Sequence, residues 1–214
     1  MMSLILVWSN YFKEKKNKIS FVLTLLFFII ISFYFKIFLT YVENWEHFLG
    51  VFNDPFFIIQ PIDFSLYIFI LTYGSLLFFF ILNLLNPEKL LKLIHLVSIL
   101  LILRSITLFL FRLDADPNMI TLGDPILNTI FYQLNENTGM YNQHDLFFSG
   151  HIANLFIISL LYDDRKIKYF FFIITFVVAV LLVIQRAHYS IDVIFAPFFS
   201  LTALYIYKKF KNIK

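Results

Sequence analysis

The chain has 214 residues, of which 60% are hydrophobic and 21% aromatic, and its mean hydropathy is +0.81. These values lie outside the usual range of a soluble globular domain and indicate a membrane protein. A net charge of +3, divided among short basic clusters, argues against a nucleic-acid partner, and the lack of cysteine excludes disulfides, thiolate nucleophiles and cysteine metal sites.

The N-terminal segment, residues 1–18, begins with a short apolar stretch that is followed by a basic run. A cleavable signal peptide has the reverse order, with positive charge first and a small-residue cleavage site last. We therefore expect residues 1–18 to form an amphipathic cytosolic lead-in. The rest of the chain, 19–214, is predicted to be a single integral membrane domain without a repeat.

Six segments approach the length of about 20 apolar residues that a spanning helix needs, which predicts an all-α, polytopic membrane protein with six transmembrane helices. The fourth and fifth segments are short, so their ends are expected to lie below the membrane surface in a protein-lined recess. The predicted spans are 19–42, 64–85, 90–112, 146–162, 168–185 and 189–207.

The loop charges predict the orientation of these spans. Basic residues fall before the first span, in two connections and after the last span, all on one side of the six-helix arrangement. The positive-inside rule places this side, with both termini, in the cytosol. The opposite loops face the periplasm, a lumen or the cell exterior. The longest of them, 113–145, is apolar enough over 126–134 to form a short interfacial helix over the site, and the sequence leaves open whether this loop is a lid.

Ser149, Gly150 and His151 open the fourth segment at the outer face. Serine is a good helix N-cap, glycine allows close backbone approach, and the free N–H groups of a helix start favour an anion such as phosphate. His151 could then protonate a leaving alkoxide. For the tripeptide by itself, ordinary helix capping with a histidine at the lipid interface is the stronger alternative.

His188 and Asp192 open the sixth segment, four residues apart and therefore on one face of a helix. A carboxylate is costly to bury there, and its simplest partner is the imidazole one turn earlier. With one ring nitrogen held by Asp192, the other is free to attack phosphorus. A structural His–Asp hydrogen bond is the alternative. Because both histidine motifs open helices at one membrane face, we interpret His151, His188 and Asp192 as catalytic residues of one phosphoryl-transfer site.

The order Ser149-Gly150-His151, then His188-Tyr189-Ser190-Ile191-Asp192, resembles the Ser-Gly-His and His-Tyr-Ser/Thr-x-Asp motifs of the sphingomyelin synthase family. This family is a branch of the type-2 phosphatidic acid phosphatase (PAP2) superfamily of six-span lipid phosphoryl-transfer enzymes. Upstream, Arg104-Ser105-Ile106-Thr107 is similar to the family's Arg-x-Ile-Thr motif, and Asp145 resembles an acidic residue before Ser-Gly-His. The resemblance is specific in the C-terminal half and extends to the first spans only in layout.

The resemblance implies a PAP2-like helical bundle that moves a phospho-head group from a membrane phospholipid to a lipid alcohol such as a sphingolipid. His188 would form a phospho-histidine intermediate and Asp192 would orient it. His151 would protonate the departing alkoxide and later deprotonate the acceptor. This scheme requires no metal and no cofactor.

Positive side chains must neutralise the phosphate charge in the transition state. Arg104, Arg186 and Arg112 are the candidates, with snorkelling to the interface as the alternative for each. The candidate phosphate- or substrate-binding residues taken from the motifs are Ser149, Gly150, Asp145 and Tyr189.

Three weaker candidates lie in or near the outer loops. Asp54, before Pro55, could line the path of the head group, although Asp-Pro is a common turn former. His47 and His144 could bind a metal together with His151, but their spacing matches no standard metal motif.

Two departures from the family pattern lie near the expected substrate mouth. Ile152 replaces a threonine, and Asp114 and Asp116 stand where a proline-bearing stretch would follow the arginine motif. They leave the acceptor open. A lipid phosphate phosphatase would use the same residues with water as acceptor. A transporter or a non-catalytic lipid-binding protein is the alternative from another class, and the sequence leaves open whether the chain is a homo-oligomer.

Overall fold

The computed structural model describes residues 3–45, 49–123 and 143–212. This part of the chain contains helices and no strand, which confirms the predicted all-α class. Residues 124–142, with the helix expected over 126–134, lie outside the described residues, and so does His47. The helices are α1 (Leu4–Tyr11), α2 (Lys15–Glu43), α3 (Ser65–Asn83), α4 (Pro87–Leu110), α6 (Gly150–Leu160), α7 (Arg165–Ile184) and α8 (Ser190–Asn212).

Five of the described helices, α2, α3, α4, α7 and α8, are long and apolar enough to cross a membrane. They confirm five of the predicted spans and the integral membrane character. The remaining expected span, 146–162, contains only the 11-residue α6. At 1.5 Å per residue α6 is about 16 Å long, against a hydrocarbon core of about 30 Å. The count of six full spans is therefore not confirmed, because the chain over 146–149 is not helical and leads into the bundle.

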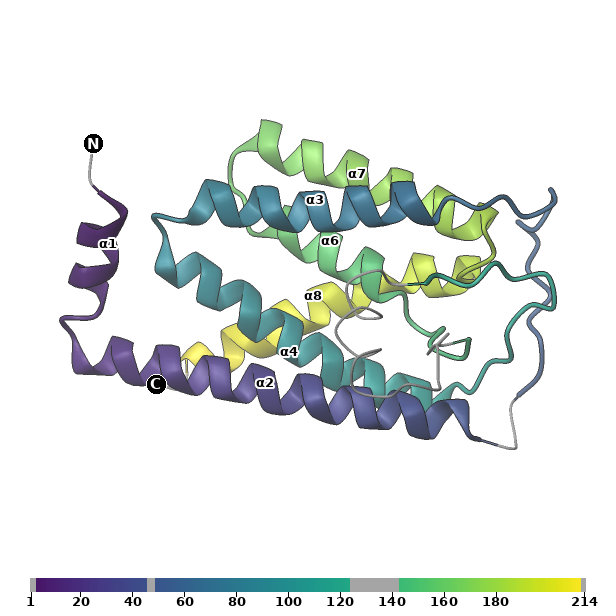
Figure 1. The fold of residues 1–214 in the computed structure, drawn as a ribbon, viewed down its shortest axis with the longest axis horizontal. Coiled ribbons are helices and arrows are strands. Elements are labelled where there is room, and N and C mark those ends of the chain that lie inside the picture. Colours follow the sequence, from purple (N-terminus) through teal and green to yellow (C-terminus); the bar gives the residue numbers. More distant parts are fainter. Residues whose placement is uncertain (1–2, 46–48, 124–142, 213–214) are drawn as a thin grey trace.

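The short helix α6 lies in the middle of the bundle, where it packs against α3, α4, α7 and α8 (Figure 1). Its side chains Ile152, Leu155, Ile157 and Ile158 are among the most buried in the protein. By contrast, α2 packs mainly along α4 and leaves much of its apolar surface exposed, as expected for a lipid-facing helix. The bundle thus holds the start of α6, and the residues that open it, in a buried position.

Local capping explains where several helices begin. Asn86 precedes α4, accepts the Lys89 N–H at 3.1 Å and is followed by proline at the first helical position. Asp164 caps α7 in the same way, by accepting the Ile167 N–H at 3.0 Å. Ser149 precedes α6, but its hydroxyl makes no capping bond. The serine expected to cap α6 therefore keeps its hydroxyl available for another partner.

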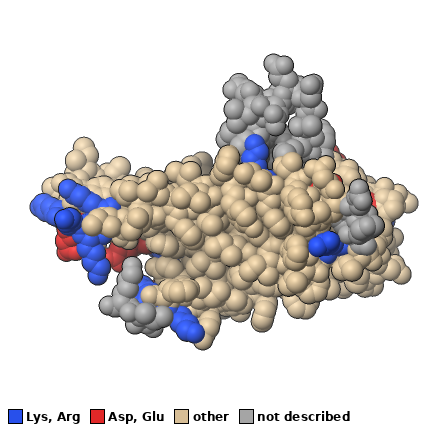
Figure 2. Space-filling model, turned by 90° about the horizontal axis from the view of Figure 1, so that it is seen from below, with Lys and Arg blue, Asp and Glu red and all other residues tan. Residues whose placement is uncertain are grey.

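Both termini lie at one end of the bundle, together with α1, the α3–α4 turn and the α6–α7 turn (Figure 1). Lysine and arginine side chains gather at this end (Figure 2). The loops 49–64 and 111–123 and the α7–α8 turn lie at the opposite end. There the first outer loop is bonded to the second, through the Leu49 N–H to the Arg112 carbonyl at 2.7 Å and the Asp114 N–H to the Gly50 carbonyl at 3.2 Å.

Candidate active site

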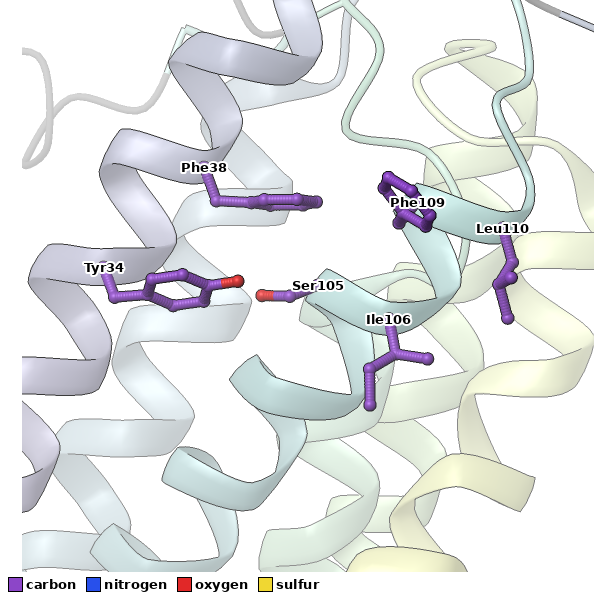
Figure 3. A pocket seen from close by; sticks show the side chains of 6 residues that line it. All are labelled: Tyr34, Phe38, Ser105, Ile106, Phe109 and Leu110. Carbon is purple, nitrogen blue, oxygen red and sulfur yellow. The ribbon is translucent and has the colours of Figure 1, made fainter.

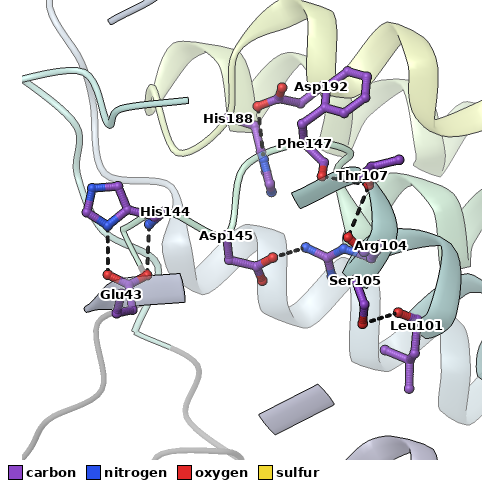
Figure 4. A network of polar contacts seen from close by, with 10 residues as sticks. All are labelled: Glu43, Leu101, Arg104, Ser105, Thr107, His144, Asp145, Phe147, His188 and Asp192. Atoms are coloured by element: carbon purple, nitrogen blue, oxygen red, sulfur yellow. Dashed lines mark hydrogen bonds and ion pairs between the residues drawn. The ribbon is translucent and has the colours of Figure 1, made fainter. Parts of the chain in front are cut away.

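The turn between α7 and α8 carries His188 and leads directly into the helix that carries Asp192. Arg186 in this turn has a φ of 57°, in the left-handed region that non-glycine residues seldom adopt. His188 is 4% exposed and Asp192 is fully buried. Nδ1 of His188 lies 3.4 Å from Oδ2 of Asp192, an ion-pair distance slightly too long for a hydrogen bond (Figure 4). The other ring nitrogen, Nε2, is therefore the one left for chemistry.

Asp192 also joins the two histidine motifs through its backbone. Its carbonyl accepts the Ser149 N–H at 3.1 Å, so the residue before α6 is bonded to the first turn of α8. Its carboxylate oxygen Oδ2 accepts the Tyr189 N–H at 3.0 Å, which is the reciprocal half of a capping box. The other oxygen, Oδ1, has no hydrogen-bond partner among the described residues.

The motif at the start of α6 faces His188. The ring centroids of His151 and His188 are 6.3 Å apart, and the His151 ring lies 6.1 Å from that of Phe69 on α3. Ser149 is fully buried, and within the described part of the chain its hydroxyl has no hydrogen-bond partner. A buried hydroxyl without a partner is costly, so this atom is a natural ligand contact.

Arg104 on α4 lies directly against the start of α6. A Cβ built on Gly150 would overlap the Arg104 guanidinium, so glycine is what allows this approach. Nη2 of Arg104 bonds Oδ1 of Asp145 at 2.5 Å (Figure 4), while its Nε has no partner among the described residues. One turn later on α4, the Thr107 hydroxyl donates to the Phe147 carbonyl at 3.0 Å. Helix α4 therefore holds the loop that precedes α6 at two points.

Arg186 is engaged by the outer loops. Its Nη1 lies 3.3 Å from Oδ1 of Asp116, its Nη2 donates to the Ile59 carbonyl at 3.0 Å, and the guanidinium lies 5.0 Å from the Phe57 ring centroid. The Nε is buried without a partner among the described residues. Arg186 thus ties the α7–α8 turn to the first and second outer loops.

Tyr189 has a similar attachment. Its ring lies 5.6 Å from those of Phe52 and Phe57, and its hydroxyl donates to the Asp114 carbonyl at 2.8 Å. Burial raises the pKa of Tyr189 to about 12, so the hydroxyl remains a protonated donor at neutral pH. The structure therefore brings Ser149, Gly150, His151, Arg104 and Asp145 into one network with His188 and Asp192, and places Arg186 and Tyr189 against the outer loops.

Gln185, which lies at the end of α7 and is fully buried, was not predicted from the sequence. Its Oε1 accepts the Phe64 N–H at 2.8 Å, and its Nε2 donates to the Ser65 hydroxyl at 2.8 Å and to the Ile120 carbonyl at 3.1 Å. Nothing in the sequence distinguishes this glutamine from one in an ordinary exposed turn.

His144, weighed as a metal ligand, lies between two carboxylates. Its Nδ1 is 2.9 Å from Oε2 of Glu43 and its Nε2 is 3.5 Å from Oδ1 of Asp114. The hydrogen bond to Glu43, opposed in part by burial, raises the pKa of His144 above its ordinary value. The described residues contain no group of three His, Asp or Glu side chains arranged for a metal.

Two further features lie apart from this network. The Arg112 guanidinium is 4.1 Å from the Trp45 ring centroid, so this arginine is occupied by a cation–π contact. A groove of about 250 Å³ opens between α2 and α4 (Figure 3). None of its lining residues is a predicted site residue; they are Tyr34, Phe38, Ser105, Ile106, Phe109 and Leu110.

Comparison with known proteins gives one finding for this region. Residues 144–209 match the sequence model of the family described as PAP2 superfamily C-terminal, which supports membership of the PAP2 superfamily. The matched stretch contains Asp145, both histidine motifs and Asp192, whereas Arg104 lies outside it. No significant match to a curated protein or to a solved structure was found.

Proposed function

We propose that the chain is a membrane enzyme that transfers the phospho-head group of a lipid through a phospho-histidine on His188, in the manner of sphingomyelin synthases. The observation that carries this proposal is the 6.3 Å separation of the His151 and His188 rings, with Asp192 beside Nδ1 of His188. Two imidazoles at this separation can both contact one phosphoryl group. The match to the PAP2 superfamily supports phosphoryl chemistry on a lipid substrate.

In the first step, Nε2 of His188 attacks phosphorus and forms a P–N bond. The P–O bond to the lipid breaks, and its electron pair stays on the departing alkoxide. Asp192 holds the proton on Nδ1 and stabilises the positive charge that develops on the ring, because its Oδ2 faces that nitrogen. The phosphoryl group is then bound covalently to His188.

His151 acts in both steps. In the protonated form it gives its proton to the departing alkoxide, and in the neutral form it takes the proton of the acceptor hydroxyl. The acceptor oxygen then forms a new P–O bond as the P–N bond breaks, which restores neutral His188 and protonated His151. The two histidines reach the substrate from α6 and from the α7–α8 turn, so their roles remain separate.

The phosphate oxygens bind at the start of α6 rather than at the start of α8. At α8 the Tyr189 and Ser190 N–H groups are already taken by carboxylates. At α6 the first N–H groups have no intrahelical partner, and the Ser149 hydroxyl lacks a partner among the described residues. Arg104 adds a positive charge at the same place. Arg186 and Tyr189 hold the outer loops at the head-group side of this site.

A lipid alcohol is the acceptor in this proposal. His188 and Asp192 are almost inaccessible to solvent, and a phospho-histidine formed there would be shielded from hydrolysis. A phosphatase would need water at the same point, beside His151. A lipid turnover assay that detects both a labelled phospholipid and free phosphate distinguishes the two acceptors.

The test is lipid turnover by the purified protein in liposomes that contain phospholipid donors, fluorescent ceramide and fluorescent diacylglycerol. Phosphatidic acid is offered separately, and EDTA is present throughout. A labelled phospholipid formed on either acceptor is the expected result and identifies the head group. Free phosphate from phosphatidic acid without a labelled product would assign a phosphatase, and turnover only after metal is restored would contradict the proposed mechanism.

The intermediate is tested with His188→Ala. This variant should lose turnover and the acid-labile phospho-enzyme that rapid quenching is expected to trap in the wild type, because it lacks the proposed nucleophile, Nε2 of His188. His95→Ala is the matched control, since His95 on α4 is bonded to Thr24 at the other end of the bundle. A His188→Ala protein that folds and turns over at the wild-type rate would refute the scheme.

A further inference from the structure

Asp54 in the first outer loop is bonded to the start of α8, 136 residues further along the chain. Its Oδ2 accepts the Ser190 N–H at 2.5 Å and its Oδ1 accepts the Ser190 hydroxyl at 3.0 Å. Oδ1 also accepts the Phe56 N–H at 2.9 Å, which closes the local turn. The side chain is buried, with the residue 5% exposed. A carboxylate this deeply buried needs such donors, so the contact has a defined geometry.

The first turn of α8 thus begins between two carboxylates. Asp192 accepts the Tyr189 N–H and Asp54 accepts the N–H of the next residue, Ser190. Both of these residues lie between His188 and Asp192 in the chain. The direction in which α8 leaves the turn, and with it the distance from Nδ1 of His188 to Oδ2 of Asp192, depends on these two bonds.

The loop that carries Asp54 is held in place by other contacts. Leu49 and Gly50 are bonded to residues 112–114, and the rings of Phe52 and Phe57 pack against Tyr189. A change confined to the Asp54 carboxylate would therefore leave the loop where it is. It would release the start of α8 and, within the loop, affect only the local turn that Oδ1 closes with the Phe56 N–H.

We propose that Asp54 is a positioning residue for the His188–Asp192 pair and acts through Ser190. This inference rests on the proposed function, since it assigns Asp54 to the same reaction. Its oxygens are occupied by Ser190 and Phe56, so Asp54 acts on the geometry of α8 and not on the substrate. The expected signature is a loss in the chemical step with little change in lipid binding.

Asp54→Asn is the first test. The side chain keeps its size, but an amide NH2 group replaces one oxygen and meets a backbone N–H that previously had an acceptor. We expect kcat to fall about tenfold or more, with KM within about twofold, because a small misplacement of catalytic groups is costly while substrate contacts are unchanged. Formation of the trapped phospho-enzyme should slow by the same factor as kcat.

Asp63→Asn is the matched control. Asp63 lies in the same outer loop and its carboxylate also accepts an N–H near a helix start, that of Ser65 at 2.9 Å, but the side chain is exposed and the helix is α3. The same chemical change should leave kcat within about twofold of the wild type, since an exposed amide can bond to water. Thermal unfolding of both variants reports on folding.

Ser190→Pro removes the same contact from the other side and decides the question if Asp54→Asn does not fold. Ser190 is the first residue of α8, a position at which proline is well tolerated. We expect the same fall in kcat. A folded Asp54→Asn or Ser190→Pro protein with the wild-type kcat, or with KM alone changed, would overturn the positioning role. A wild type that turns over none of the lipids would instead refute the proposed function.

Discussion

At position 150 there is no room for a side chain. The Arg104 guanidinium occupies the space where a Cβ would be, so any other residue at position 150 would displace the arginine or the start of α6. Glycine is therefore required here because the Arg104 guanidinium approaches the start of α6 closely. The start of α6 is also the proposed phosphate-binding site.

The first prediction is that Gly150→Ala lowers kcat at least about tenfold and also lowers the thermal midpoint, because the displaced Arg104 loses its contact with the site. Gly74→Ala on α3 is the control. Nothing lies within 4 Å of a Cβ built there, so alanine in this helix should be neutral or stabilising by about 0.5–1 kcal/mol. Equal behaviour of the two variants in the liposome assay would argue against the Arg104 contact.

Asp192 offers a second prediction at this scale. Asp192→Asn keeps the shape of the side chain but can present an NH2 group to Nδ1 of His188, which then favours the wrong tautomer. We expect kcat to fall by about a hundredfold or more, whereas KM changes little. The measurement is steady-state turnover with the same donors and acceptors. Wild-type turnover in a folded Asp192→Asn protein would reject the orienting role.

At the scale of residues, spacing was enough to predict that His188 and Asp192 lie together, and the structure places Nδ1 of His188 3.4 Å from Oδ2 of Asp192. The shared helix face was wrong, because His188 lies in the turn before α8 and only Asp192 is in the helix. Their catalytic roles stay predictions. The contact between Asp54 and Ser190 could not have been predicted, because nothing in an Asp-Pro turn indicates that its carboxylate bonds a helix start 136 residues away. The contacts of Gln185 could not be predicted either, because they also join residues that are far apart in the sequence.

At the scale of elements, the link between α2 and the loop before α6 depends on one histidine. Glu43 is the last residue of α2. Its Oε1 accepts the backbone N–H of His144 at 2.8 Å, and its Oε2 lies 2.9 Å from Nδ1 of the His144 ring. His144 is followed by Asp145, which pairs with Arg104. The end of a peripheral helix is thereby connected to the loop that leads into the site.

This link predicts a pH dependence of stability. The pKa of His144 is raised in the folded protein by its hydrogen bond to Glu43, with Asp114 as a second facing carboxylate. A raised folded-state pKa means that the contact stabilises the fold fully below the unfolded value of about 6.5, and that this contribution is lost as pH rises through the folded value. The thermal midpoint should therefore fall across this window.

Glu43→Gln is the comparison for that measurement. The neutral amide no longer favours the protonated ring, so the thermal midpoint should fall less between pH 6 and alkaline pH than it does in the wild type. Parallel curves for the two proteins would show that another group controls the pH dependence. The readout is thermal unfolding in detergent and needs no substrate.

The lengths of the apolar runs predicted where the five candidate spanning helices begin and end, and most of these ends are correct to within a few residues. They could be predicted because span length and capping are local properties. The fourth predicted span did not follow this rule. Residues 146–149 lead into the bundle without forming a helix, and α6 starts only at Gly150. A buried segment can be this short because the surrounding protein satisfies its backbone polar groups. A hydropathy window does not show which segments are surrounded in this way.

At the scale of the whole molecule, the basic end of the bundle predicts how the protein lies in the membrane. Lysine and arginine side chains gather at the end with both termini, and the outer loops lie at the end with the candidate site (Figures 1 and 2). The positive-inside rule predicts that the site faces away from the cytosol. Lipids of the outer leaflet would then be the donors and acceptors, since the start of α6 lies near that end.

The chain contains no cysteine, so single cysteines can report this orientation without any background. Ile58 and Asn118 are exposed in the outer loops, and Lys16 and Lys209 are exposed at the basic end. We expect Ile58→Cys and Asn118→Cys to react with a membrane-impermeant maleimide in intact spheroplasts, and Lys16→Cys and Lys209→Cys to react only after permeabilisation. The reverse pattern would place the site at the cytosolic leaflet, and labelling of Lys16→Cys and Lys209→Cys on opposite sides would contradict the shared end of the two termini.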